Sequence, residues 1–286
     1  MKKVIYYFTG TGNSMRAALK ITECVGDVEI ISMRNEPSDV PAEDCDMIGF
    51  IFPVYHWTVP EPAVRFIKEL KINTSAYIFA LAMPSFICGF ACEHLQALLV
   101  EKGASLSYGE KVNSVANYAL VYPPMPSPKL VVPKTEKKLE RIALEIKQQI
   151  KKPFPRAGFM VRARYDKMMP PYKALQKYAD YPFTISQSCI SCGLCSRVCP
   201  CYNIELIDGK PNFLHHCAQC MACVAFCPKR AIGYELTPDN KLQLASNSSN
   251  TPITNLMGLP AKRKLYHNPY ITAADIMKNS VKITKE

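Results

Sequence analysis

The sequence lacks the two features that would place it across or beyond a membrane. Its first ten residues, MKKVIYYFTG, contain two lysines followed by only five apolar residues, too few for the hydrophobic core of a secretion signal. The uncharged stretch from Ala76 to Cys92 is short for a membrane span and is interrupted by Pro84 and Gly89. With 48% hydrophobic and 21% charged residues, the chain predicts a soluble, cytoplasmic protein with a sizeable core.

Negative charge is scarce: 24 Asp and Glu residues accompany 35 Lys and Arg residues, a formal net charge of +11. Much of the imbalance lies in residues 134–177, which hold 13 basic and four acidic residues. Most of these charges are expected on a solvated helix and linker, and the alternative is a docking face for an acidic partner protein. Nucleic acid binding is the weakest interpretation, because charge alone is a poor signal for it.

Expected strands alternate with expected helices over the first 122 residues, which predicts βαβ units and an α/β fold with a parallel sheet. Lys3–Phe8, for example, is rich in β-branched and aromatic residues, as is typical of a strand buried on both faces. The other expected strands are Val28–Ser32, Asp46–Val54, Tyr77–Met83 and one that begins within Ser105–Val112. The expected helices are Asn13–Cys24, Pro62–Leu70 and Phe90–Lys102.

The pattern changes after Tyr122, where four prolines interrupt residues 123–128. A helix is expected from Thr135 to about Ile150. Its apolar face would consist of Leu139, Ile142, Ile146 and Ile150. The chain therefore divides into an α/β domain (1–122), a basic helical and proline-rich linker (123–180), a cysteine-rich domain (181–235) and a C-terminal tail (236–286). The tail predicts a polar loop, SNSSNTP, and a short docked helix, with no recognisable chemistry.

Thirteen cysteines in a chain without a secretion signal indicate metal binding rather than disulfides, because the cytosol keeps thiols reduced. Eight of them form two copies of C-x2-C-x2-C-x3-C-P, which are CISCGLCSRVCP and CAQCMACVAFCP. A loop with thiolates three residues apart can wrap a cubic iron–sulfur cluster, and the fourth cysteine of this pattern ligates the other cluster. Cluster I would therefore take Cys189, Cys192, Cys195 and Cys227. Cluster II would take Cys217, Cys220, Cys223 and Cys199.

This spacing indicates two [4Fe–4S] clusters, and about fifty residues of the chain resemble a bacterial two-cluster ferredoxin with every ligand present. The alternative, a pair of zinc sites, would need only four ligands at each site, commonly as C-x2-C pairs. Cys201 is expected to pack, since both ligand sets are complete without it. Cys24, Cys45, Cys88 and Cys92 are likewise expected to be buried packing residues. For Cys88 and Cys92, which are four residues apart, the alternative is a redox role.

The second motif is YYFTGTGNS, residues 6–14, in which an apolar strand ends in threonines and glycines before a helix. Such a turn directs amides and the positive end of a helix dipole toward an anion. It lacks the lysine of a P-loop, and Met15 stands where the dinucleotide motif G-x-G-x-x-G needs its third glycine. The remaining neutral donors can hold a static phosphate monoester. They are the hydroxyls of Thr9, Thr11 and Ser14 and the amides of Gly10, Thr11, Gly12 and Asn13.

TGTGNS after a first strand resembles the phosphate loop of flavodoxins, and the resemblance covers about residues 1–122. It implies a doubly wound sheet of order 2-1-3-4-5 with FMN at the carboxyl ends of the strands. The loop after the third strand would contact the flavin ring through Pro53, Val54, Tyr55, His56 and Trp57. The later loop AMPSFICGF departs from the family, whereas VNSVANY, residues 112–118, is similar to a strand-end segment of flavodoxin-like proteins. The alternatives are an empty turn and ordinary rim packing of these side chains.

Together the two motifs resemble the flavodoxin-domain ferredoxin fusions of anaerobic microbes, in which a flavodoxin-like α/β domain precedes a small α+β two-cluster ferredoxin-like domain. That resemblance implies an electron-transfer protein that passes single electrons between two [4Fe–4S] clusters and FMN, and that serves an acidic redox partner protein. No catalytic base or nucleophile is evident. One alternative is a flavin-dependent reductase of a small acceptor, and another is a ferredoxin attached to a flavin-free scaffold.

Overall fold

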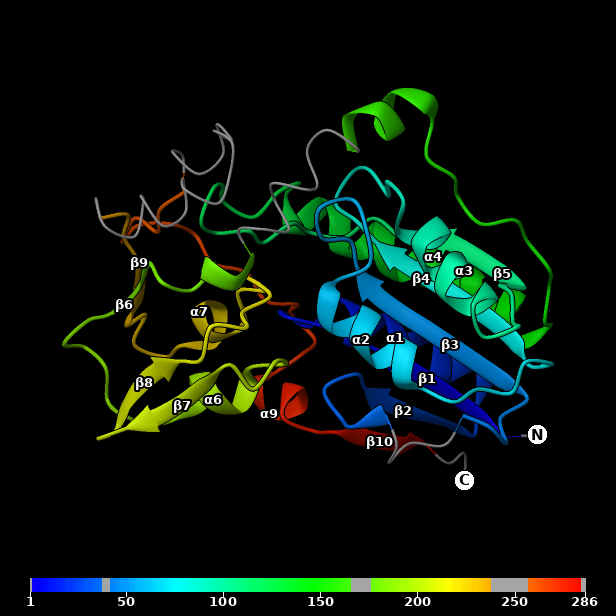
Figure 1. Ribbon diagram of the computed structural model, residues 1–286, viewed down its shortest axis with the longest axis horizontal. Helices are drawn as coiled ribbons and strands as arrows, with labels where there is room; N and C mark the ends of the chain where they lie inside the picture. The colour runs from blue at the N-terminus through cyan, green and yellow to red at the C-terminus, as the bar shows by residue number, and fades with distance from the viewer. Residues whose placement is uncertain (1, 38–41, 166–175, 238–256, 284–286) are drawn as a thin grey trace.

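The computed structural model describes residues 2–37, 42–165, 176–237 and 257–283. A six-stranded sheet forms one part of the molecule, and the cysteine-rich segment packs beside the carboxyl ends of its parallel strands (Figure 1). The sheet has the order β10-β2-β1-β3-β4-β5. Its strands are β1 (Lys3–Tyr7), β2 (Val28–Ser32), β3 (Met47–Pro53), β4 (Tyr77–Met83), β5 (Tyr108–Lys111) and β10 (Ser280–Ile283).

The predicted strand order 2-1-3-4-5 is confirmed. Strand β1 pairs in parallel with β2 and β3, β3 with β4, and β4 with β5. The sheet is therefore the flavodoxin-like, doubly wound type, whose strand order reverses beside β1. This reversal opens a crevice at the carboxyl ends of β1 and β3, where the two predicted binding loops begin.

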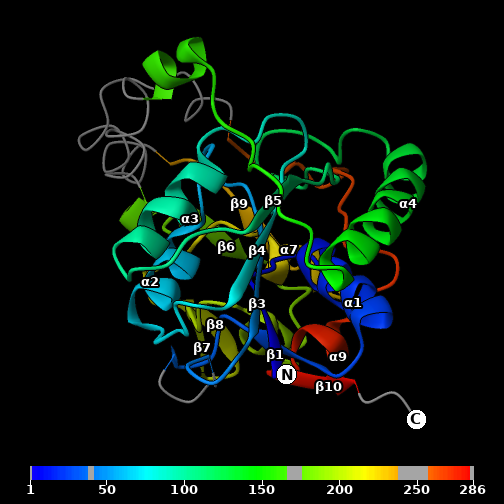
Figure 2. The same ribbon diagram turned by 90° about the vertical axis from the view of Figure 1, so that its right-hand side faces the viewer.

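Side chains of β1 alternate between two cores, as expected for a strand covered on both faces. Tyr6 belongs to the core beneath helices α2 (Glu61–Glu69) and α3 (Ala91–Val100). Tyr7 belongs to the core beneath α1 (Asn13–Val25) and α4 (Pro128–Lys147). Figure 2 shows the two helix pairs on opposite sides of the sheet. No helix within the described ranges has both the length and the apolar character of a membrane span.

Helix α4 begins and ends earlier than the sequence predicts. It starts at Pro128 rather than Thr135, because proline at the first helical position loses no intrahelical hydrogen bond. It ends at Lys147, and Ile150 is 41% exposed rather than part of the apolar face. The other predicted positions, Leu139, Ile142 and Ile146, are buried against α1.

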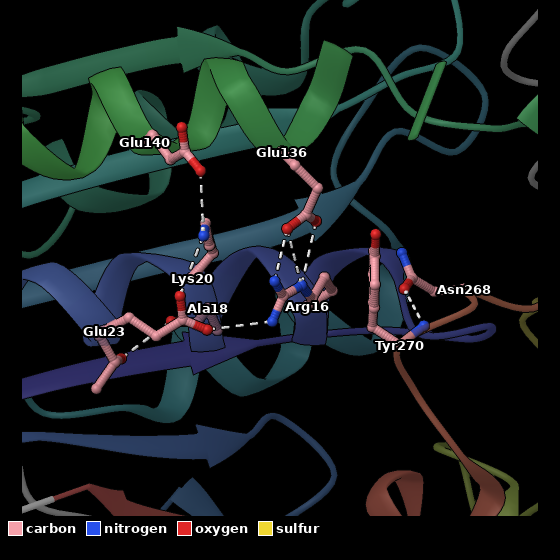
Figure 3. Close-up of polar contacts among 9 residues, drawn as sticks. Arg16, Ala18, Lys20, Glu23, Glu136, Glu140, Asn268 and Tyr270 are labelled. Atoms are coloured by element: carbon pink, nitrogen blue, oxygen red, sulfur yellow. Dashed lines mark hydrogen bonds and ion pairs between the residues drawn. The ribbon is translucent and has the colours of Figure 1, made fainter. Parts of the chain in front are cut away.

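An ion-pair network joins α4 to α1 (Figure 3). The Arg16 guanidinium donates to both carboxylate oxygens of Glu136, with its closest contact at 2.6 Å. Lys20 pairs with Glu140 of α4 and with Glu23 of its own helix. Arg16 also lies over the ring of Tyr270, 4.8 Å from its centroid. Arg16 therefore connects α1, the segment predicted to be a linker and the C-terminal tail.

The tail extends the sheet beyond the predicted strands. Strand β10 pairs antiparallel with β2, so that Val281 lies opposite Ile30. The predicted docked helix is α9 (Ala273–Ile276), which begins with a capping box formed by Thr272 and Asp275. The predicted loop SNSSNTP lies outside the described residues. Because β10 covers β2, the polar backbone groups along that edge are paired.

The cysteine-rich segment is a small α+β unit with internal repetition. Strand β6 (Phe183–Ile185) pairs with β9 (Ile232–Tyr234), and β7 (Ile204–Ile207) forms a hairpin with β8 (Lys210–Phe213). Helices α6 (Leu194–Val198) and α7 (Ala222–Phe226) follow equivalent cysteines, and left-handed residues, Gly193 and Met221, precede them. Ala119 and Leu120 from the first part of the chain pack into the core of this unit. The two parts therefore share buried surface.

Gly49 of β3 offers a test of this packing. A Cβ atom at this position would lie 2.2 Å from Cζ of Phe79 on β4, so the ring fills the space that a side chain would need. Gly49→Ala should lower the free energy of unfolding by about 1–3 kcal/mol, measured by urea denaturation under anaerobic conditions. Gly158→Ala is the control, because no atom lies within 4 Å of its added methyl group. Equal stabilities of the two variants would contradict this account.

Candidate functional site

The turn after β1 presents unused hydrogen-bond donors. Gly12 precedes α1 in the left-handed conformation, with φ of 95°, and no side chain caps the helix. The Gly12 amide donates to Thr9 Oγ1 at 3.1 Å, which braces the turn internally. The first amides of α1 therefore point out of the helix toward the crevice, where a helix N-terminus favours an anion.

Ser14 supplies the independent sign of a ligand. Its side chain is 1% exposed, and its hydroxyl has no hydrogen-bond partner in the protein. A buried hydroxyl without a partner costs free energy, so such groups usually meet a ligand or water. Thr11 has a protein partner, since the Asn117 amide donates to its Oγ1. The turn thus fits the predicted phosphate site, with Ser14 as its clearest open donor.

The glycines of this turn are required by close approach from two other segments. A Cβ atom on Gly10 would lie 2.3 Å from the carbonyl oxygen of Cys220, in the second cysteine motif. A Cβ atom on Gly12 would lie 2.8 Å from Cβ of Ile271, in the tail. The turn is therefore compressed between the cysteine-rich unit and the tail.

The tail also supports this turn through hydrogen bonds, although the sequence shows no role for it. The Asn268 amide donates to the Thr11 carbonyl at 2.8 Å. Asn13 Oδ1 accepts from the side chains of Tyr266 and Asn268 at 3.0 and 3.1 Å. These bonds hold the start of α1 in place from the side opposite the crevice.

The loop after β3 forms a tight turn with strained backbone. Tyr55 and Thr58 exchange two backbone hydrogen bonds, and both residues between them have positive φ, 48° for His56 and 65° for Trp57. This is the conformation of a type I′ turn, which normally favours glycine or asparagine. Gly89 packs against this turn, and it must be glycine because a Cβ atom there would lie 2.4 Å from Cβ of Trp57. Strain of this kind is characteristic of binding sites.

These loops surround a cavity of about 400 Å³ at the carboxyl ends of the strands. Ten of the eleven predicted cofactor-binding residues line it, and the exception is Gly12, which faces the tail. The predicted residues in its wall are Thr9, Gly10, Thr11, Asn13, Ser14, Pro53, Val54, Tyr55, His56 and Trp57. The loops after β4 and β5 complete it with residues 83–87 and 114–118. The sequence analysis missed Val121, Tyr122, Ala218 and Gln219.

The eight predicted ligand cysteines line two smaller cavities. Cys189, Cys192, Cys195 and Cys227 line one, which we call cavity I. Cys199, Cys217, Cys220 and Cys223 line the other, cavity II. The fourth cysteine of each motif thus lies with the first three of the other motif. Among the described residues, no three potential ligands converge on a single metal ion.

The pKa values of the cysteines in cavity II indicate that their thiolates need a positively charged partner. Burial, with a smaller contribution from the nearby Cys199, raises the pKa of Cys220 to about 12. Burial likewise raises the pKa of Cys223, with added repulsion from Cys220 and Cys199. Amides of Asn203, Gln219 and Ala231 lie 3.2–3.3 Å from the sulfurs of Cys199, Cys217 and Cys227. Thiolates in these positions therefore need a positively charged partner, and the amides are placed to stabilise them.

The remaining cysteines lie apart from these sets or behind them. Cys201 borders cavity II and packs against the core of the sheet. The Cys88 and Cys92 sulfurs lie 4.0 Å apart in that core, with Cys92 fully buried. Cys45 is also buried, and Cys24 is half-buried. All thirteen cysteines are free thiols.

The main finding that sequence could not supply is the contact between the two motifs. Ala218 and Gln219 lie between Cys217 and Cys220, and they form part of the wall of the 400 Å³ cavity. The Tyr118 hydroxyl, on the same wall, donates to Gln219 Oε1 at 2.9 Å. In the sequence, the one hint of this contact is the glycine at position 10, where the Cys220 carbonyl leaves no room for a side chain. One loop of the chain therefore borders both the phosphate-loop cavity and cavity II.

His56 gives this site a pH dependence that can be measured. Burial lowers the pKa of His56 from 6.5 to about 3. Between these values the unfolded chain binds a proton that the folded chain excludes, so stability falls as the pH drops below about 6.5. His56→Asn, which tolerates the positive φ, should lose less unfolding free energy than the wild type between pH 8 and 5.5 in urea titrations. Parallel pH curves for the two proteins would contradict a buried neutral imidazole.

Comparisons with known proteins find one similar curated protein and several similar solved structures. No family model matches the sequence. An uncharacterized ferredoxin from Methanocaldococcus jannaschii is 30% identical over 97 residues, which cover 32% of this chain and 55% of that protein. This chain thus spans about half the length of that relative.

Similar solved structures include an FMN-bound flavodoxin of Fusobacterium nucleatum, 16% identical, with a TM-score of 0.38, covering 53% of this chain and all of that one. Another is a two-electron reduced flavodoxin of Megasphaera elsdenii, 18% identical, with a TM-score of 0.35, covering 49% of this chain and 98% of that one. These scores are low, so the fold assignment rests on the strand order and the cysteine pattern. On that evidence, the chain joins a flavodoxin-like domain to a ferredoxin-like cysteine module.

Proposed function

We propose that this protein transfers electrons between two [4Fe–4S] clusters, held in cavities I and II, and an FMN held in the 400 Å³ cavity. The observation that carries the proposal is the packing of Cys220 against Gly10, which joins the second cysteine loop to the phosphate turn. FMN exchanges electrons singly or in pairs, and each [4Fe–4S] cluster exchanges one. A cytoplasmic location belongs to the proposal, because none of the thirteen cysteines forms a disulfide, as suits a reducing compartment.

The residues present fit an FMN. The open amides of α1 and the unpartnered Ser14 hydroxyl would hold the phosphate with neutral donors. Tyr55, Trp57 and Tyr118 supply aromatic and apolar surface along the walls of the same cavity. Burial keeps the Tyr55 phenol and the His56 imidazole neutral, since it raises the pKa of the first and lowers that of the second. The alternative of a flavin-free scaffold leaves the buried Ser14 hydroxyl unexplained.

The residues present also fit two clusters. In cavity II, the first three cysteines of the second motif would be joined by Cys199 of the first motif. In cavity I, the first three cysteines of the first motif would be joined by Cys227 of the second motif. Each motif would thereby hold both clusters and fix their separation. Backbone amides lie beside three of the sulfurs, where they would stabilise added negative charge.

The loop from Cys217 to Cys220 would connect the cofactors. Its buried residues border cavity II on one side and the FMN cavity on the other. Ala218 is 6% exposed, so at this residue the loop is packed between the two sites. A packed contact of this kind would keep donor and acceptor close together, which is what this chain would contribute to the transfer.

One observation favours a second function, the reduction of a small acceptor. Phe86 and Ile87, in the unusual loop after β4, are 53% and 52% exposed where they line the FMN cavity. Exposed apolar side chains at the mouth of a cavity can bind a flat, apolar molecule. Turnover of quinones or nitro compounds by the loaded protein, lowered in Phe86→Ala, would favour this function over a pure carrier role.

The composition of the protein tests the proposal directly. Protein purified without oxygen should contain about eight irons, eight acid-labile sulfides and one FMN per chain. Iron and labile sulfide would be measured chemically, and flavin by absorbance after acid release. Eight irons with no flavin, even after incubation with FMN, would support the flavin-free alternative. Zinc in place of iron and sulfide would refute the cluster assignment.

Gly10→Ala tests the connection between the two parts. Its methyl group would collide with the Cys220 carbonyl, so the cysteine loop must move away from the FMN cavity. After rapid mixing with dithionite, flavin reduction should lag behind cluster bleaching by several-fold more in this variant than in the wild type. Gly158→Ala, whose methyl group meets no atom within 4 Å, is the control. An unchanged lag in a variant that retains flavin and iron would show that this contact is not the route.

A further inference from the structure

The two cysteine cavities differ in their access to solvent. Around cavity I, Cys192 is exposed and Cys189, Cys195 and Cys227 are partly exposed. Around cavity II, Cys217 is partly exposed, but Cys199, Cys220 and Cys223 are buried, each 8–9% exposed. Cavity II is also bordered by the loop that closes the FMN cavity. A protein that approaches from solvent can come close to cavity I, whereas the rest of the chain covers cavity II.

We propose that the surface around cavity I, which we call the cavity I face, is the docking site for a small acidic electron-transfer protein. The proposal rests on the proposed function, and it assigns the two clusters different tasks. The cluster in cavity I would exchange electrons with the partner, and the cluster in cavity II would exchange them with the FMN cavity. The cavity I face consists of Ile190, Cys192, Leu206 and Lys229, which line the cavity, together with Arg197 and Lys210 beside it.

The centre of this face is apolar. Ile190 and Leu206 are 57% and 42% exposed, and both line cavity I beside its four cysteines. Leu206 comes from β7, and its Cδ1 atom lies 3.2 Å from the position of a Cβ on Gly193, so it packs directly on the first cysteine loop. Gly209, in the hairpin turn after β7, packs against Ser191 of the same loop. Exposed apolar side chains at the centre of a patch with a polar rim are typical of protein interfaces.

The charged rim of this face is mainly basic. Lys229 lines cavity I, and Arg197 Nη1 lies 3.4 Å from the Cβ position of Gly193 in its wall. Lys210 stands between Gly209, which packs against Ser191, and Pro211, which lines the cavity. All three basic residues are exposed, as are the acidic residues Glu205 and Asp208 of the same hairpin. Glu205 accepts a hydrogen bond from the Asn212 side chain, within the hairpin. The excess of positive charge is complementary to an acidic partner, which it would attract before contact.

Part of the positive charge in the described residues of the basic segment 134–177 is paired within the protein. Lys138 and Lys152 pair with Glu110, Arg141 with Glu145 of the same helix, and Arg162 with Glu93. The pairs with Glu110 and Glu93 join α4 and the chain after it to the sheet domain. The charges of these four basic residues are therefore compensated internally, unlike that of Lys229, which forms no ion pair among the described residues.

Electron transfer from a defined acidic protein tests the cavity I face. The probe is a purified acidic bacterial ferredoxin, reduced with dithionite and mixed with the oxidised, fully loaded chain at low ionic strength. The second-order rate of cluster reduction should fall about tenfold or more in Lys210→Glu/Lys229→Glu, because steering depends on complementary charge. The wild-type rate should fall steeply with added salt, and that of the variant should not. Leu206→Asn should slow the reaction without changing its salt dependence.

Two controls match these changes away from the face. Lys134→Glu/Lys137→Glu alters the net charge equally on α4, and both of these lysines are exposed. Leu130→Asn removes a side chain that is 65% exposed on the same helix. Reductions in rate as large in the controls as in the test variants would overturn the proposal. So would transfer that is fast and independent of salt in the double-glutamate variant.

Each protein is assayed first for iron, for flavin and for flavin reduction by dithionite without a partner. These readouts separate the docking proposal from the proposed function. A wild type whose clusters accept electrons from the ferredoxin while its flavin stays oxidised would contradict the internal relay and leave the docking face intact. If the clusters reduce the flavin, but the Lys210→Glu/Lys229→Glu variant accepts electrons from the ferredoxin as fast as the α4 control, the docking proposal is wrong and the internal relay stands.

Discussion

The close approach of Cys220 to the phosphate turn is the contact on which the rest of this architecture depends. A backbone carbonyl occupies the space in which any side chain at position 10 would lie. Two modules joined only by a flexible linker would leave the separation of their cofactors variable. Here a glycine allows one module to pack on the other, and the shared core around Ala119 and Leu120 maintains that packing. The two modules are therefore packed into one unit rather than tethered by a linker.

The C-terminal tail makes this contact possible from the other side. Tyr266 and Asn268 hold Asn13, Ile271 occupies the space at Gly12, and β10 then pairs with β2. The last residues of the chain thus return to the first strand–helix turn. Arg34, at the end of β2, donates to the carbonyls of Arg197 and Ile276 and stacks on Tyr202. Through it, the sheet, the cysteine module and the tail meet at one side chain.

Sequence reasoning succeeded where a local pattern has one structural solution. Alternating elements predict the parallel sheet, and the resemblance of the TGTGNS turn to flavodoxins implies the strand order that the structure has. The spacing of the cysteines predicts that Cys199 and Cys227 lie with the opposite motif, as they do in cavities I and II. Sequence reasoning failed where the cause is tertiary. The role of Asn268 depends on a partner 255 residues away. Helix α4 starts early although Pro133 lies inside it, and in this first part Val132 is buried against Val115 and Tyr266. Neither cause leaves a periodic signal in the chain.

The unequal burial of the two cysteine sets gives the proposed relay a direction in space. A cluster held by Cys192 would lie near solvent, and one held by Cys220 would lie beneath the phosphate turn. Crossed ligation couples these positions, because Cys199 and Cys227 each leave one motif to complete the other. A displacement of either cysteine loop would therefore disturb both clusters. The contact at Gly10 and the shared cysteines therefore link the outer site, the inner site and the 400 Å³ cavity, so that a displacement at one of them would reach the other two.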